Sequence, residues 1–129
     1  MSVDIVPVDV YAFGGRSAPR PPRIEGYNLK PGQTTDMTPN ENGFIGPTEP
    51  PEGASTFGDL AQAPLAGHYH RLRGGTMLPE GLGIKADGID IAGGTRQPTH
   101  HTIYPTRAML PAEFDQLFQS LPWEYGGRL

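Results

Sequence analysis

The stretch Thr99-His100-His101-Thr102-Ile103-Tyr104-Pro105 decides how this chain of 129 residues is interpreted. Its β-branched and aromatic residues predict a strand, and the proline marks the end of that strand. Because successive side chains of a strand face opposite sides, one histidine points inward and the other points outward to the surface. A buried imidazole is costly unless it has a polar partner. The inward histidine is therefore either part of a functional site or paired within the core.

An amphipathic helix is predicted directly after this strand, over residues 111–119. Pro111 suits the first turn of a helix, and Pro122 closes the segment. Apolar side chains recur at helical spacing and form one stripe, which we assign to the core: Leu110, Phe114, Leu117 and Phe118.

Short strands separated by turns and loops are predicted upstream of this unit. The expected strands span residues 3–13, 43–45, 68–72, 76–78 and 82–86. A short helix is expected within residues 57–66, with Asp59 as its N-cap. The proline-rich segment 16–56 is expected to form long ordered loops. Strands with one or two helices predict an α+β fold, in one domain over residues 1–129.

Composition excludes several classes of protein. The formal net charge is −4, and the basic residues are mostly scattered, so no nucleic-acid partner is predicted. No apolar run is long enough to predict a membrane span, and the first residues do not resemble a signal peptide. The sequence contains no cysteine, which excludes disulfides, thiolate metal sites and a cysteine nucleophile. We expect a protein that works in a reducing cytoplasm and reaches it without a signal peptide.

The histidines are the first candidates for a site. His100 or His101 could act as a metal ligand, as a general base, or as an anchor for a phosphate or ribose. His68 and His70 lie two residues apart and share one strand face, so four histidines on two strands could hold zinc. The alternative is that His68 and His70 are solvated strand residues.

Hydroxyl, aromatic and basic side chains give further candidates. Ser55 and Thr56 stand next to Phe57 after a loop rich in glycine and proline, although no G-x-S-x-G motif surrounds them. An ordinary turn or helix cap is the alternative interpretation. Tyr11 is either a core residue or a ring-stacking platform, and Arg16 is either a surface residue or an anion-binding residue.

Three segments in register resemble a known toxin family. Residues 99–109 are similar to the C-terminal signature of the type VI secretion effectors known as type six exported effector two, which are classed as ADP-ribosyltransferase-like. The segment from Leu78-Pro79 to Asp87 and the loop residues Gly43, Pro47, Gly53, Ser55 and Phe57 match the same family in order and spacing. The resemblance covers residues 43–118.

The first strand resembles the opening strand and loop of pertussis- and cholera-type ADP-ribosylating toxins. The matching residues are Val10-Tyr11, Arg16, Pro21-Pro22 and Ile24. Those toxins place an arginine directly after the tyrosine, whereas this chain has Ala12. No glutamate is visible on the penultimate strand, near the position of His100.

The resemblance implies an ADP-ribosyltransferase-like fold, with two small β-sheets packed around a cleft and a C-terminal helix. It implies NAD as cofactor, with His100 and Ser55 as catalytic residues. Cofactor-binding residues would be Tyr11, stacked on the nicotinamide, Arg16 at the diphosphate, and the hydroxyls of Ser55 and Thr56. Tyr11, Ser55 and His100 are therefore expected to converge on one cleft.

The implied function is that of an antibacterial toxin, which acts in the cytoplasm of target cells by NAD-dependent ADP-ribosylation or NAD cleavage. Its expected partners are a cognate immunity protein and a secretion-system carrier. The residues around Arg16, Arg20 and Arg23 form a local positive edge that an acidic patch of the immunity protein could use for steering. Two alternatives remain open. One is a non-enzymatic toxin of the same fold that binds and blocks a target, which Ala12 favours, and the other is a histidine-metal hydrolase or nuclease.

Overall fold

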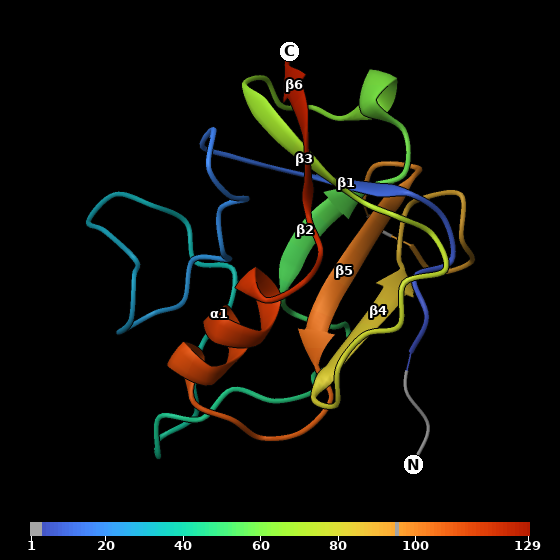
Figure 1. Ribbon diagram of the computed structural model, residues 1–129. Helices are drawn as coiled ribbons and strands as arrows, with labels where there is room; N and C mark the ends of the chain where they lie inside the picture. The colour runs from blue at the N-terminus through green and yellow to red at the C-terminus, as the bar shows by residue number, and fades with distance from the viewer. Residues whose placement is uncertain (1–3, 95) are drawn as a thin grey trace.

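Six strands form one antiparallel sheet in the computed structural model, which describes residues 4–94 and 96–129 (Figure 1). The strand order is β4-β5-β2-β1-β3-β6. One α-helix, α1, and one short 3-10 helix, η1, complete the fold. The elements are β1 (Val10–Gly14), β2 (Ala54–Phe57), η1 (Leu60–Gln62), β3 (His68–Leu72), β4 (Leu82–Ala86), β5 (His100–Pro105), α1 (Pro111–Gln119) and β6 (Glu124–Arg128).

The expectation of two separate sheets is wrong. The sheet has two halves, β4-β5-β2 and β1-β3-β6. Strand β1 pairs with β2 as well as with β3, and this pairing joins the two halves into one sheet. The joint is narrow, since β1 and β2 share one register pair, Tyr11 with Phe57, whereas β1 and β3 share five. The fold is therefore mostly β, with one sheet and a helix near the C-terminus.

Local sequence patterns predicted some strands and missed others. The predictions of β3 and β4 match the structure, and β5 starts one residue later and ends at Pro105. The first strand begins only at Val10, while the segments 43–45 and 76–78 contribute single bridges, Ile45 to Met109 and Met77 to Ile5. Neither β2 nor β6 was predicted. Both contain small or polar residues, and pairing with longer neighbours makes them strands.

Helix α1 covers the predicted residues 111–119 and anchors the core. Pro111 occupies its first turn, and Phe114 and Phe118 are fully buried. The assignment of Leu110 to the core is wrong, because 52% of this residue is exposed at the N-cap position. Helix α1 is too short to cross a membrane, and the described part of the chain contains no helix long and apolar enough to do so.

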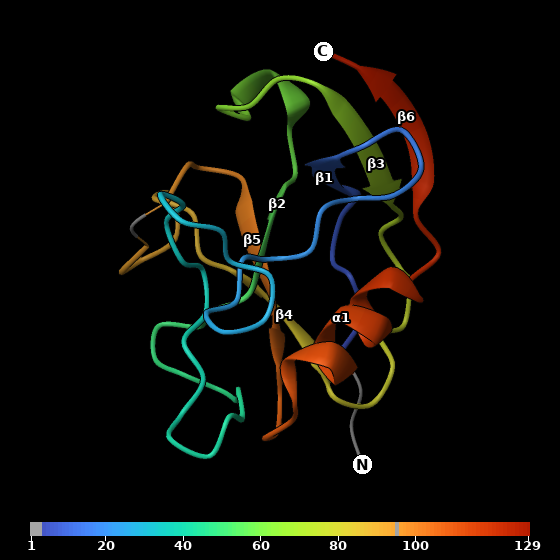
Figure 2. The same ribbon diagram turned by 90° about the vertical axis from the view of Figure 1, so that its left-hand side faces the viewer.

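The proline-rich segment between β1 and β2 is ordered by its own apolar residues. Ile24, Met37 and Ile45 are buried in the core, and Ile24 forms a bridge with Met37. Figure 1 shows this segment, blue to cyan, to the left of the sheet on the side where α1 also lies, and Figure 2 shows both in front of the sheet. A long connection without strands or helices is thus fixed by burial, as expected for a loop with a positional role.

Candidate functional site

Strands β2 and β5 bring Ser55 and His100 to one face of the sheet. Ser55 pairs with Thr102 and Phe57 pairs with His100, so these four side chains point to the same side. Ser55, Phe57 and His100 line one cavity of about 400 Å³, together with Pro64 from the segment after η1. This volume is typical of small-molecule sites. Residues far apart in the sequence thus meet in one cavity.

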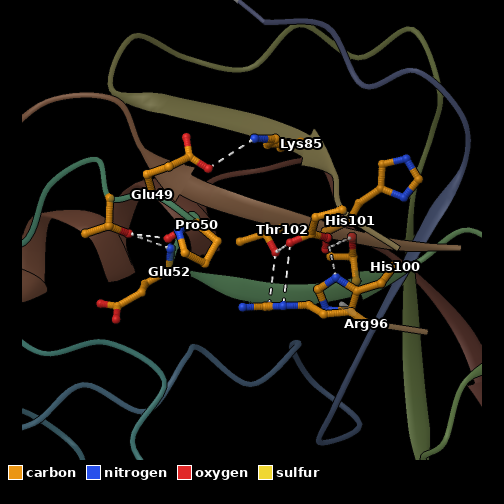
Figure 3. Close-up of polar contacts among 11 residues, drawn as sticks. Glu49, Pro50, Glu52, Lys85, Arg96, His100, His101 and Thr102 are labelled. Carbon is orange, nitrogen blue, oxygen red and sulfur yellow. Dashed lines mark hydrogen bonds and ion pairs between the residues drawn. The ribbon is translucent and has the colours of Figure 1, made fainter. Parts of the chain in front are cut away.

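His100 and His101 point to opposite sides of β5, and both are buried (Figure 3). The exposed fractions are 4% for His100 and 8% for His101. The expectation that one of them lies at the surface is wrong, because β5 is an interior strand and is covered on both faces. His101 Nδ1 donates a hydrogen bond to the Thr99 carbonyl at 2.9 Å, so this ring nitrogen has a partner within the fold.

The imidazole of His100 is held by Asp87, which directly follows β4. Asp87 Oδ1 lies 2.6 Å from His100 Nδ1, and Asp87 Oδ2 accepts a hydrogen bond of 2.6 Å from the Thr102 hydroxyl. The Arg96 guanidinium contacts both groups, with its Nε 3.6 Å from Asp87 Oδ2 and its Nη1 donating to Thr102 Oγ1 at 3.2 Å (Figure 3). This histidine therefore has a charged partner, and that partner has two further contacts of its own.

Asp87 stays ionised although it is largely buried. Burial acts to raise the pKa of this carboxyl, but hydrogen bonds from His100 and Thr102 and the charges of His100 and Arg96 outweigh it and lower the pKa. The Asp87 carboxylate can thus accept hydrogen bonds at both oxygens near neutral pH.

A second cavity of about 290 Å³ adjoins the first and shares Ser55, Phe57 and Pro64 with it. We call the two together the site groove. Arg23 on its wall is paired with Asp36 at 3.4 Å. The groove thus combines arginines with apolar and aromatic rings, and its remaining lining residues are Phe13, Arg20, Pro21, Pro22, Ala54, Leu65, Ile89, Arg96, Gln97 and His100.

Three predicted cofactor-binding residues lie outside the groove. Tyr11 lines a separate hollow with Leu60 and packs edge-on against Tyr69, so it does not converge with Ser55 and His100. Thr56 faces the opposite side of β2, where it is fully buried and donates to the His101 carbonyl. Arg16 is exposed in the turn after β1 and lines neither cavity of the groove. Alternation along β2 explains why only one of the two adjacent hydroxyls reaches the groove.

The other histidines have local partners. His70 is buried and its Nε2 donates to the Gly15 carbonyl at 2.7 Å, while His68 Nδ1 lies 2.9 Å from the Tyr125 hydroxyl. The interpretation of His70 as a solvated strand residue is therefore wrong. Within residues 4–94 and 96–129, no three histidine, aspartate or glutamate side chains are placed to hold a metal ion. The metal-hydrolase alternative has no ligand set in that part of the chain.

Sequence reasoning did not single out Asp87 or Arg96 as site residues. Asp87 appeared only as part of the family match. The available signal was the pairing of two predicted strands, residues 82–86 and 99–104, since an antiparallel pair joined by one loop brings the residue after the first strand beside the start of the second. A buried imidazole in need of a partner would then have pointed to that carboxyl.

The comparisons with known proteins leave this geometry as the main guide to function. No protein-family model matches the sequence, and no curated protein is significantly similar to it.

The lowered pKa of Asp87 makes a prediction about stability in acid. A carboxyl whose pKa is lower in the folded protein than in the unfolded chain contributes stability above its unfolded pKa, near 3.9, and loses it as the pH falls through the folded pKa. The stability advantage of the wild type over Asp87→Asn at about pH 5 should therefore shrink toward about pH 2. Urea unfolding across this range measures it, and a constant advantage would contradict the prediction.

Proposed function

We propose that this chain is an antibacterial toxin domain that binds NAD in the site groove and acts on the nicotinamide–ribose bond. The observation that carries the proposal is the meeting of Ser55 and His100 in one cavity, with the imidazole held by Asp87. Support also comes from the resemblance of residues 43–118 to ADP-ribosyltransferase-like effectors, in which matching positions supply the site. The product is either an ADP-ribosylated target or cleaved NAD.

The groove offers the groups that this chemistry needs. Cleavage of the nicotinamide–ribose bond passes through an oxocarbenium-like transition state, as glycoside hydrolysis does. The Ser55 hydroxyl and the His100 ring, which both line the groove, can hydrogen-bond the ribose hydroxyls and orient the sugar. Phe57 lines the groove with a small exposed part of its ring, which can contact the flat nicotinamide where Tyr11 was first expected. Arg96 brings a positive charge that complements the diphosphate.

A non-enzymatic toxin is the second candidate function, and one observation favours it. Asp36, which lines the groove, and Asp87, which contacts His100, are both already paired with cations. Ala12 stands where related toxins place an arginine, and its side chain is buried, 2% exposed. Such a protein would bind and block its target without consuming NAD.

Expression of the chain inside a bacterial cytoplasm tests the proposal. Growth should arrest after induction, and NAD extracted from the cells should fall or label from NAD should appear on a target. Purified protein should release nicotinamide when it is incubated with NAD and a cell lysate. Arrest with intact NAD and no transferred label would favour the blocking toxin instead, and normal growth would reject both toxin functions.

The proposal includes two partners, a cognate immunity protein and a secretion-system carrier, and a route of delivery that needs no signal peptide. An immunity protein that covers the groove would block it directly. Arg20 and Arg23 line the groove, so an acidic patch on that partner would meet positive charge there.

A further inference from the structure

We propose that Asp87 is a positioning residue that holds the His100 ring in one tautomer, with Nδ1–H toward Asp87 and Nε2 toward the site groove. The inference deepens the proposed function, since it rests on His100 as the residue that meets the substrate. Asp87 itself affects the substrate only by positioning His100.

Two hydrogen-bond donors and one cation converge on the carboxylate and fix its place. His100 Nδ1 occupies one oxygen, and the Thr102 hydroxyl and the Arg96 guanidinium share the other. The backbone adds a fourth constraint, because the amide of Asp87 donates to the carbonyl of His100 at 3.1 Å. Thr102 is fully buried and His100 is 4% exposed, so these contacts form away from water. A carboxylate with both oxygens occupied has little freedom to rotate.

The position of the proton on His100 follows from this geometry. An ionised carboxylate only accepts hydrogen bonds, so the nitrogen that faces it must carry a proton. In the neutral ring, Nε2 is then an acceptor, and it has no hydrogen-bond partner among the residues that the structure describes. Phe57 packs edge-on against the ring at 5.3 Å and 86°, which restricts its rotation. The ring therefore presents an acceptor to the groove that Ser55 also lines.

A ring in this state suits a ribose hydroxyl or the Ser55 hydroxyl as its partner. Either hydroxyl can donate to Nε2, and the ring can take up that proton while Asp87 stabilises the resulting positive charge. A ring with its proton on Nε2 would instead offer a donor to the groove and would place an unprotonated Nδ1 against a carboxylate. Asp87 therefore decides what His100 offers to a ligand.

A structural ion pair is the alternative role of Asp87, and it is distinguished by the Asp87→Asn variant, since loss of a purely structural pair would leave the turnover of the folded variant unchanged. The wild-type tautomer tests the premise that both roles share. Nitrogen-15 NMR of the wild-type protein, made by cell-free synthesis, reports which ring nitrogen is protonated. The His100 signals are assigned by their loss in the His100→Asn variant. At a pH where the ring is neutral, we expect Nδ1 protonated and Nε2 unprotonated. The opposite pattern, or a mixture like that of a free histidine, would overturn the proposal.

The Asp87→Asn variant tests the consequence, with Asp115→Asn as the matched control. An amide has one acceptor oxygen and no charge, so it cannot replace the two hydrogen bonds and the ion pair of Asp87. The oxygen of an amide at position 115 can still accept from the Tyr27 hydroxyl. Asp87→Asn should move the His100 proton toward Nε2 and lower NAD turnover by about 100-fold or more, the effect of holding a histidine in the wrong tautomer. Asp115→Asn should change neither.

The two readouts separate this inference from the function that it deepens. If the wild-type protein has no NAD turnover, the proposed enzyme is rejected, while the tautomer still decides whether Asp87 positions the ring. If Asp87→Asn is folded and keeps both the wild-type tautomer and the wild-type turnover, the positioning role is rejected. If Asp87→Asn does not fold, the wild-type tautomer measurement still tests the proposal, because a proton on Nε2 or a mixture of tautomers would overturn it.

Discussion

Cells that express the Ser55→Ala or the His100→Asn variant should keep growing where the wild type arrests them. Both side chains line the groove, and loss of a group that positions or exchanges a proton with the substrate costs about 100-fold or more in rate. Asparagine is chosen because its amide can still donate to Asp87, in place of Nδ1, while the groove-facing end of the ring is removed. Colony counts after induction and nicotinamide release by purified variants measure the effect.

Matched substitutions outside the groove control for general damage. Ser17→Ala and His68→Ala change the same residue types at positions that line neither cavity of the groove. Both controls should remain as toxic as the wild type. Full toxicity of folded Ser55→Ala and His100→Asn would remove these two residues from the mechanism.

Phe114→Ala should destabilise the fold by about 3–5 kcal/mol. Phe114 is completely buried in the core and stacks with Phe118, so its removal leaves a cavity between α1 and the sheet. A domain of this size has a free energy of unfolding of about 5–15 kcal/mol, so the loss is a large part of the total. Urea denaturation with circular dichroism measures the change in the midpoint.

Leu110→Ala on the same helix is the internal control. Leu110 is 52% exposed, so the same kind of truncation should change stability by about 0.5 kcal/mol or less. Equal losses at positions 110 and 114 would show that the packing of α1 differs from the structure described above.

Much of the fold could be predicted from local patterns, and the rest depended on pairing between distant segments. Helix α1 and strand β5 have strong signals, because proline positions and side-chain periodicity fix their ends. Strand β2 has only four residues and follows a proline-rich loop, so it exists because β1 and β5 flank it. The same strand explains the wrong number of sheets, since its pairing with β1 joins the two halves.

The candidate site likewise contains residues that could be predicted from the sequence and residues that could be found only from the pairing of strands. Ser55 and His100 could be chosen from the sequence, because the family resemblance marks both positions. Thr56 could be set aside only once the register of β2 was known, since one step along a strand reverses the face. Tyr11 lies on the same face of the sheet as Phe57, but it lines a different hollow from Ser55 and His100. The position of that hollow depends on the path of the segment around η1. Asp87 and Arg96 gain their roles only through the pairing of β4 with β5.

The loop between β4 and β5 has its two ends held together by backbone contacts close to the site. The amide of Ile89 donates to the Arg96 carbonyl at 2.7 Å, and Gly88 bridges Arg96, so the loop has its own base. Asp87 and His100 lie just below that base and are tied by a backbone hydrogen bond. Ile89, which forms part of this base, and Gln97, whose carbonyl accepts a hydrogen bond of 2.9 Å from the His100 amide, line the groove. Under the proposed function, a change in the length or sequence of the loop could therefore alter what the groove binds and leave the Asp87–His100 pair intact.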